Sequence, residues 1–175
     1  MKYSYISASA TNSKLGISVS TFNVQSSSRS GWLESVKIGN ENNYSASIIA
    51  GGNYNAGDVE SNSVEIINSN INSGQIFGGR RSGGGGLVSS NTVTISDNST
   101  VSDQVYGGNA FGEGAAGRVE YNKVVITESY LGKSAYGGKI NEKGSATGNS
   151  VDVSENSVIT ENVYGAEVWL IVQLQ

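Results

Sequence analysis

The sequence predicts an all-β fold, a parallel β-helix or solenoid of about five coils, from three observations. A V-x-I or V-x-V pattern occurs five times, at Val36/Ile38, Val64/Ile66, Val93/Ile95, Val124/Ile126 and Val151/Val153. An aromatic-Gly-Gly element or a close variant follows each copy, at Ala50-Gly51-Gly52, Phe77-Gly78-Gly79, Tyr106-Gly107-Gly108, Tyr136-Gly137-Gly138 and Tyr164-Gly165-Ala166. The first Gly of each element recurs after 27, 29, 30 and 28 residues. Repeats of this length bury their apolar face only against neighbouring repeats.

The first half of each repeat is predicted to be β-structure. The V-x-I alternation places both aliphatic side chains on one face of a strand, and the intervening residue on the other. The outward residues are Glu65, Thr94, Val125 and Asp152, of which Val125 breaks the polar pattern and is expected to be partly covered. A polar turn and a second aliphatic residue then lead to the aromatic-Gly-Gly strand end, and equivalent strands are expected to stack about 4.8 Å apart.

The second half of each repeat varies in length. Nearly all the variation lies between the second Gly and the next repeated Asn, in segments 53–61, 80–90, 109–121 and 139–148. These segments are therefore predicted to be surface loops. The repeated asparagines Asn62, Asn91, Asn122 and Asn149 are predicted to form an internal amide ladder.

The 175 residues are predicted to form one domain. Residues 34–166 hold the repeats, and 1–33 form a degenerate N-terminal coil or cap in which Phe22-Asn23 aligns with Gly51. Residues 167–175 include the most apolar run of the chain, and a β-helix needs protected ends. This segment is expected to be a cap or an assembly edge.

Composition excludes several classes of function. The chain has no Cys, His or Pro, so it can form neither a disulfide nor a Cys/His metal site. Its 11 basic and 15 acidic residues are dispersed, which argues against nucleic-acid binding. No apolar run reaches the roughly 20 residues of a membrane span, and the N-terminus lacks the apolar core of a signal peptide. Membrane attachment would therefore come only from regions outside this sequence.

One compound motif resembles a known family. Tyr136-Gly137-Gly138 is followed by Gly144, by Ala146-Thr147-Gly148-Asn149 and by Val151-x-Val153, and the motif closes at Val163-Tyr164-Gly165. This pattern, over residues 34–166, resembles the passenger repeats of bacterial autotransporter-type adhesins. The resemblance implies a right-handed β-helix displayed at the bacterial cell surface. The signal peptide and translocator barrel of that family are absent from this sequence.

No catalytic, cofactor or metal residues are predicted. The candidate carboxylates for glycoside hydrolysis are Glu65, Asp97, Asp103 and Asp152, but the sequence has no Asp-Asp pair. The stretch Asn53-x-Asn55-x-Gly57-Asp58 lacks the closing Glu of a calcium loop. The aromatic ladder Phe77, Tyr106, Tyr136 and Tyr164 could bind sugar rings, but is interpreted as a structural stack.

Recognition is assigned to the variable segments. The candidate ligand-binding residues are Asn53, Tyr54, Asp58, Arg80, Arg81, Phe111 and Glu113. The expected function is that of a non-enzymatic surface adhesin segment or rigid stalk, which contacts a glycan or protein of a host or neighbouring cell. The alternatives are a polysaccharide-processing β-helix and a structural solenoid that associates end to end or as a homo-oligomer.

Overall fold

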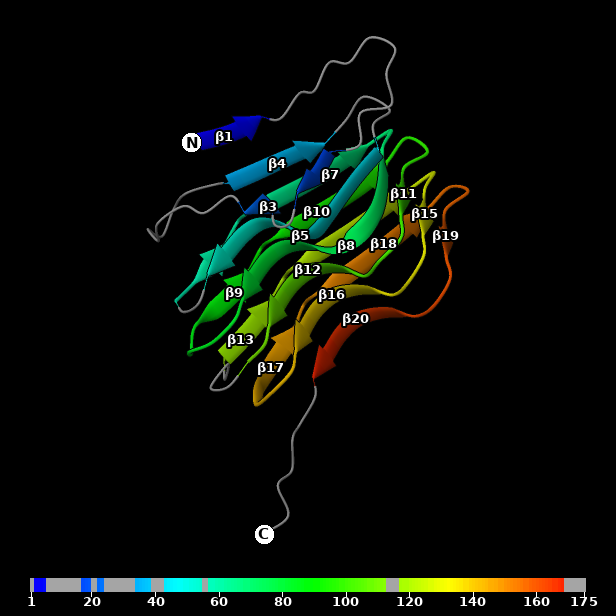
Figure 1. Cartoon of the computed structure of the whole chain (residues 1–175). Coiled ribbons are helices and arrows are strands. Elements are labelled where there is room, and N and C mark those ends of the chain that lie inside the picture. Colours follow the sequence, from blue (N-terminus) through cyan, green and yellow to red (C-terminus); the bar gives the residue numbers. More distant parts are fainter. Residues whose placement is uncertain are drawn as a thin grey trace.

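The structure is a computed structural model, which describes residues 2–5, 17–19, 22–23, 34–38, 43–54, 57–112 and 117–168. Before residue 50 and at 52–54 only the backbone is described. The described chain consists of strands joined by turns, and every described strand pair is parallel. The predicted parallel β-solenoid is therefore confirmed (Figure 1).

The V-x-I strands form the first of three sheets. Its six strands are stacked in chain order, β1, β4, β7, β10, β14 and β18. Their bounds are Lys2–Tyr5, Glu34–Ile38, Ser63–Ile67, Thr92–Ser96, Lys123–Thr127 and Ser150–Ser154. Val93 lies opposite Val64 on one side and Val124 on the other, so the motif positions form continuous columns.

The second sheet contains the aromatic-Gly-Gly strands. Its elements are β2 (Ile17–Val19), β3 (Phe22–Asn23), β5 (Asn43–Tyr54), β8 (Asn70–Arg81), β11 (Thr100–Val101), β12 (Val105–Ala110), β15 (Tyr130–Leu131), β16 (Ala135–Ile140), β19 (Val158–Ile159) and β20 (Val163–Val168). Phe22 and Asn23 of the degenerate first coil lie opposite Ile49 and Ala50. The predicted alignment of Asn23 with Gly51 was therefore wrong by one residue.

A third sheet lies in the segments predicted to be loops. It is formed by β6 (Val59–Glu60), β9 (Leu87–Ser89), β13 (Gly117–Glu120) and β17 (Gly144–Thr147). The prediction that these whole segments are surface loops was therefore wrong. Their C-terminal parts carry a G-x-V or G-x-A pattern that begins five residues before the repeated Asn, and the valines are buried. Only the few residues before each pattern vary in length.

The interior holds two aliphatic clusters. The larger lies between the first two sheets and contains the V-x-I residues of β7, β10 and β14 with Ile71, Val101 and Leu131. The smaller lies against the third sheet and contains Val59, Val88, Ala110, Val119 and Ile140. Since each fully buried aliphatic side chain contributes roughly 1.5–3 kcal/mol, these columns stabilise a chain rich in Gly, Ser and Asn.

The predicted asparagine ladder separates the two clusters. The backbone N–H and the Nδ2 of Asn91 both donate to Oδ1 of Asn122, at 3.0 and 2.8 Å. The same pair of bonds joins Asn62 to Asn91 and Asn122 to Asn149. The amides of Asn91, Asn122 and Asn149 also donate to carbonyls of the third sheet, as Asn122 does to Val88 at 2.9 Å. The ladder therefore satisfies buried polar groups from coil to coil.

Candidate functional site

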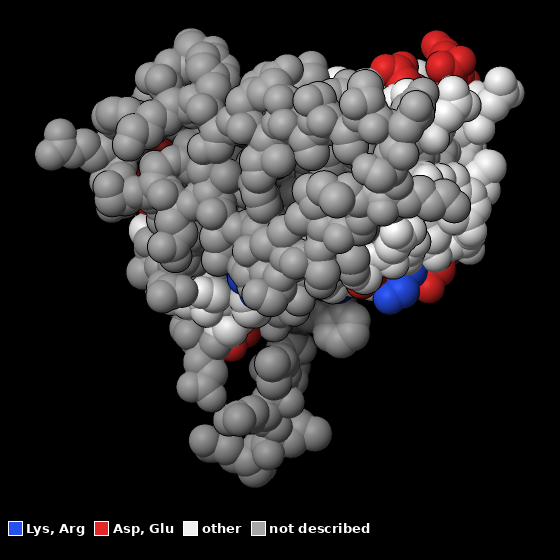
Figure 2. Space-filling model, turned by 45° about the horizontal axis from the view of Figure 1, so that its top comes forward, with Lys and Arg blue, Asp and Glu red and all other residues white. Residues whose placement is uncertain are grey.

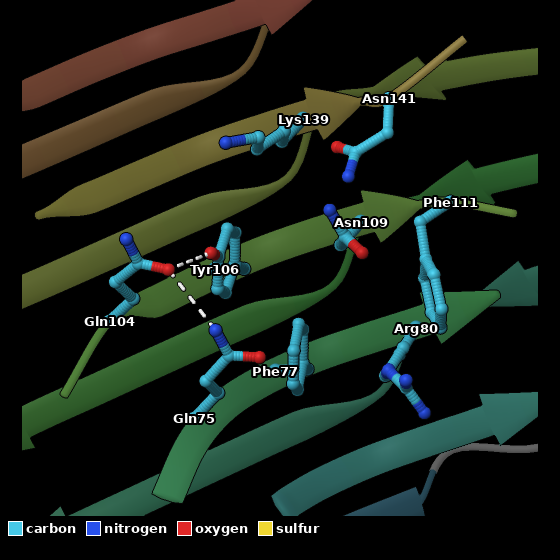
Figure 3. A pocket seen from close by; sticks show the side chains of 9 residues that line it. All are labelled: Gln75, Phe77, Arg80, Gln104, Tyr106, Asn109, Phe111, Lys139 and Asn141. Carbon is cyan, nitrogen blue, oxygen red and sulfur yellow. Dashed lines mark hydrogen bonds between the residues drawn. The ribbon is translucent and has the colours of Figure 1, made fainter. Parts of the chain in front are cut away.

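A hollow of about 300 Å³ lies on the outer face of the second sheet, over β8, β12 and β16 (Figure 3). We call it the polar hollow. It is lined by Gln75, Phe77, Arg80, Gln104, Tyr106, Asn109, Phe111, Lys139 and Asn141. The volume is at the lower end of the range of small-molecule sites.

Strand alternation explains why these side chains face outward. Val105 belongs to the aliphatic core, so the next residue of the strand, Tyr106, points to the opposite side. Parallel register then aligns equivalent residues of successive coils. Tyr106 lies opposite Phe77 and Tyr136, and Asn109 lies opposite Arg80 and Lys139. The polar hollow therefore consists of rows that run across the coils.

The aromatic row is a continuous stack. The ring centroids of Phe77, Tyr106, Tyr136 and Tyr164 are 4.8, 4.9 and 5.0 Å apart, with planes within 8° of parallel. Phe77, Tyr106 and Tyr136 are 2–6% exposed. Because the faces of the inner rings are covered by their neighbours, these rings are not free to stack on a sugar. This geometry agrees with the structural interpretation of the ladder.

Arg80 is held by two aromatic rings at one end of the polar hollow. Its guanidinium carbon lies 4.1 Å from the ring centroid of Phe111 and 5.3 Å from that of Phe77. Burial lowers the pKa of Arg80, yet a guanidinium stays protonated at neutral pH. Figure 3 shows Arg80 and Phe111 side by side. Contacts of this kind fix the position of the charge.

Lys139 supplies a second cation. It lies two coils after Arg80, with Asn109 on the coil between them. Its Nζ lies 4.4 Å from the ring centroid of Tyr136 and 2.7 Å from Oε2 of Glu167. The ion pair offsets part of the positive charge, so the polar hollow is not strongly cationic.

The remaining lining groups are amides. Nε2 of Gln75 donates to Oε1 of Gln104 at 3.1 Å, and the hydroxyl of Tyr106 donates to the same oxygen. Gln104 is thereby oriented by two donors. Burial raises the pKa of Tyr106, with further contributions from Tyr136, Asp103 and Glu167, so this hydroxyl remains a hydrogen-bond donor at neutral pH.

This combination of groups suits a ligand rich in hydroxyl groups. Amides donate and accept hydrogen bonds, and two positioned cations add donors. No carboxylate is among the lining residues. The carboxylates considered from the sequence lie elsewhere: Asp103 pairs with Lys133 at 2.9 Å, and Asp152 pairs with Lys123 at 2.5 Å. Among the described residues, no group of three or more acidic side chains could hold a metal ion.

Two of the predicted ligand-binding residues, Arg80 and Phe111, meet in the polar hollow. Asn53 and Tyr54 lie on β5, with their backbones opposite Arg80 and Arg81. Asp58 is exposed at the start of the third sheet, where its Oδ1 accepts the N–H of Leu87 at 2.8 Å. Glu113 lies outside the described residues.

Arg81 is fully buried and faces the interior. It lies opposite Ala110, which in turn lies opposite Ile140. A methyl group added to Gly117 would lie 2.6 Å from Nη2 of Arg81, so this glycine leaves the space that the guanidinium fills. Burial lowers the pKa of Arg81, and the charge of Asp58 opposes that shift.

Sequence reasoning missed five lining residues, Gln75, Gln104, Asn109, Lys139 and Asn141. A signal for most of them was present. Gln75 and Gln104 stand two residues before the aromatic of their repeat, and Arg80, Asn109 and Lys139 stand three residues after it. Fixed offsets in a solenoid predict that such residues share one row.

On the face shown in Figure 2, the described charged side chains are few and of both signs. The described part of the chain contains no helix long and apolar enough to span a membrane. Comparison with models of protein families, with curated proteins and with solved structures finds no match.

Proposed function

We propose that this chain is a non-enzymatic, surface-exposed β-solenoid segment of a bacterial adhesin of the autotransporter kind, and that its polar hollow binds a saccharide of a host or neighbouring cell. The compound repeat supports the first part of the proposal. The polar hollow supports the second, because its amide and cationic groups are of the kinds that hydrogen-bond hydroxyl groups.

The observation that carries the proposal is the rigid placement of these groups. Arg80, Asn109 and Lys139 are held on adjacent coils by backbone register. Arg80 is further fixed by Phe111, and Gln104 by Gln75 and Tyr106. A preorganised site loses little conformational entropy when a ligand binds.

A polysaccharide-processing enzyme is the less favoured candidate. Glycoside hydrolysis by the usual route uses two carboxylates about 5–10 Å apart across the scissile bond. The polar hollow is lined by amides and cations, and the nearby Glu167 pairs with Lys139. These groups suit retention of a saccharide better than its hydrolysis.

The first test is binding of the purified chain to an array of saccharides and extracellular-matrix proteins at physiological salt. We expect selective, saturable binding to saccharides. The variant N109S/N141A should weaken it about thirty-fold, since two hydrogen bonds of roughly 1 kcal/mol each are removed. Ser145→Ala, at an exposed position on the third sheet, is the matched control.

Three results would contradict the proposal. Equal loss of binding in the Ser145→Ala control would place the site away from the polar hollow. Absence of binding across the array, with an intact β-sheet spectrum, would favour a rigid stalk that carries no recognition site of its own. Turnover of a bound polysaccharide would instead favour the enzymatic alternative.

A further inference from the structure

The two ends of the polar hollow differ in charge. One row of side chains crosses it from coil to coil, three residues after the aromatic of each repeat, and contains Arg80, Asn109, Lys139 and, past the lining residues, Glu167. Arg80 lies on β8 and Lys139 on β16, with β12 between them. Because adjacent strands are about 4.8 Å apart, the backbones of the two cationic residues are separated by roughly 10 Å.

Arg80 forms the positively charged end. Its guanidinium carbon lies over the rings of Phe111 and Phe77, and the residue is partly buried (Figure 3). The rings position a planar fork of N–H donors, whose geometry matches the two oxygens of a carboxylate. Since partial burial lowers the effective dielectric constant around the guanidinium, it attracts an anion more strongly than an arginine surrounded by water does.

Lys139 forms the other end, where a carboxylate is already bound. Its Nζ lies 2.7 Å from Oε2 of Glu167, and the two side chains are only 12% and 19% exposed. Salt screens a pair that is covered to this extent only weakly, so the pair persists at physiological ionic strength. A second negative group at this end would be repelled by Glu167. The row therefore suits a ligand with one negative group at the Arg80 end, and does not suit a polyanion.

Amide groups occupy the interval between the two ends. Asn109 lies between Arg80 and Lys139 in the row, and Gln104 and Asn141 also line the hollow. A carboxylate bound by Arg80 would hold the rest of its ligand against Asn109, which is one coil or about 4.8 Å away. A carboxylate on one carbon of a sugar ring and a hydroxyl two ring carbons away are separated by a similar distance. One acidic sugar unit therefore reaches both groups, and the volume of about 300 Å³ suits a small ligand.

We propose that the polar hollow selects an acidic saccharide, with one carboxylate on the guanidinium of Arg80 and hydroxyl groups on the neighbouring amides. The inference rests on the proposed function, which requires only a saccharide, and it specifies the chemical class of that saccharide. Hexuronic acids and sialic acids share this chemistry. The carboxylate sets the orientation of the sugar, because the Arg80 end attracts a negative group and Glu167 repels one.

The test measures the affinity of the full chain for matched acidic and neutral saccharides by isothermal titration calorimetry. One pair is a disaccharide of glucuronic acid and N-acetylglucosamine and its carboxyl-reduced form, and the other is sialyllactose and lactose. We expect an acidic saccharide to bind about ten-fold more tightly than its neutral partner, which corresponds to about 1.4 kcal/mol. The pair that shows this ratio identifies the source of the carboxylate.

Variants of Arg80 locate the preference. Arg80→Gln should bring the ratio of the two affinities close to one, because it removes both the charge and the planar fork. Arg80→Lys keeps the charge without the fork, so it should retain only part of the preference. Arg118→Gln, at an exposed arginine of the third sheet, is the matched control and should leave the ratio unchanged. Urea unfolding checks that each variant keeps the fold.

Equal binding of the acidic and neutral forms would overturn this inference and leave the proposed function intact. Binding of none of these saccharides would also overturn it, while the saccharide array decides the proposed function separately. A preference for the acidic form that persists in Arg80→Gln would mean that the carboxylate is bound elsewhere. Tighter binding of a heparin tetrasaccharide than of either acidic saccharide would contradict the restriction to one negative group.

Discussion

The Cα of Gly108 faces the side-chain amide of Asn122, and a methyl group placed there would lie 2.5 Å from both Cγ and Nδ2 of that residue. Gly108 and Asn122 are 14 residues apart in the sequence and lie on successive coils. The repeated second glycine and the repeated asparagine are thus one structural unit. Gly108 is not among the residues with positive φ, so its backbone conformation does not require glycine. Glycine is required because the amide of Asn122 approaches the backbone so closely.

The substitution Gly108→Ala is predicted to lower the free energy of unfolding by about 1–3 kcal/mol, the usual cost of overpacking a dense interior. The variant Asn122→Ala alone is also destabilising, because it removes the acceptor of the N–H and Nδ2 of Asn91. In the Asn122→Ala variant the side-chain amide that would collide with the new methyl group is absent. Gly108→Ala should therefore lower the free energy of unfolding less in this variant than in the parent. Urea unfolding of the double-mutant cycle measures this coupling.

Gly85→Ala, at an exposed position, is the matched control and should change the free energy of unfolding only slightly. Strictly additive effects of Gly108→Ala and Asn122→Ala would show that the glycine is required for a reason other than the amide.

The position of a ring in the aromatic stack should set its contribution to stability. Tyr106 stacks on two rings and Tyr164 on one. Each stacked pair contributes about 0.5–1.5 kcal/mol beyond area burial. Tyr106→Leu should therefore lower the free energy of unfolding about twice as much as Tyr164→Leu, measured by thermal and urea unfolding. Equal losses in the two variants would indicate that the stack adds little beyond the burial of each ring.

The stability of the chain is predicted to fall at alkaline pH because of Tyr106. Burial raises the pKa of Tyr106 above the value of about 10 that it has in the unfolded chain, and Tyr136, Asp103 and Glu167 add to the shift. The folded chain then holds this proton more tightly than the unfolded chain. The resulting stabilisation is complete below about pH 10 and is lost as the pH rises further.

The variant Tyr106→Phe cannot lose this proton, so its melting temperature should fall less steeply above about pH 10 than that of the parent. Tyr130→Phe, at an exposed tyrosine, is the control. If both variants flattened the profile equally, the burial of Tyr106 would not be the cause.

Much of the fold could be predicted from the sequence, because three features repeat with strict spacing. The V-x-I pattern, the repeated asparagine and the aromatic residue each proved to be a column of the solenoid. In a solenoid a residue type that recurs at one offset stacks on itself, so sequence periodicity translates directly into contacts.

The third sheet was missed because its strands are short and follow segments of variable length. The pattern G-x-V five residues before the asparagine, as in Gly86-x-Val88 before Asn91, was the available signal.

Part of the candidate site was also missed from the sequence. Arg80 was assigned to a loop as a neighbour of Arg81, but strand alternation sends one guanidinium to the polar hollow and the other to the interior.

The boundary between variable segment and third sheet can be tested by insertion. A Gly-Ser-Gly-Ser insertion between Gly114 and Ala115, just before β13, lengthens a segment whose length already differs between repeats. Loop-closure entropy grows slowly with length, so the free energy of unfolding should fall by only about 0.6 kcal/mol or less.

A single Ser inserted between Val119 and Glu120 should have a much larger effect, although it adds fewer atoms. It reverses the faces of the strand residues that follow and displaces Asn122 from the ladder. The buried groups that bond to Asn122 would lose their partner, at roughly 1–3 kcal/mol each. Urea unfolding should therefore rank the Ser insertion as far more destabilising than the Gly-Ser-Gly-Ser insertion. The opposite ranking would mean that the third sheet does not fix the ladder, and that residues 117–120 tolerate changes of length as a loop does.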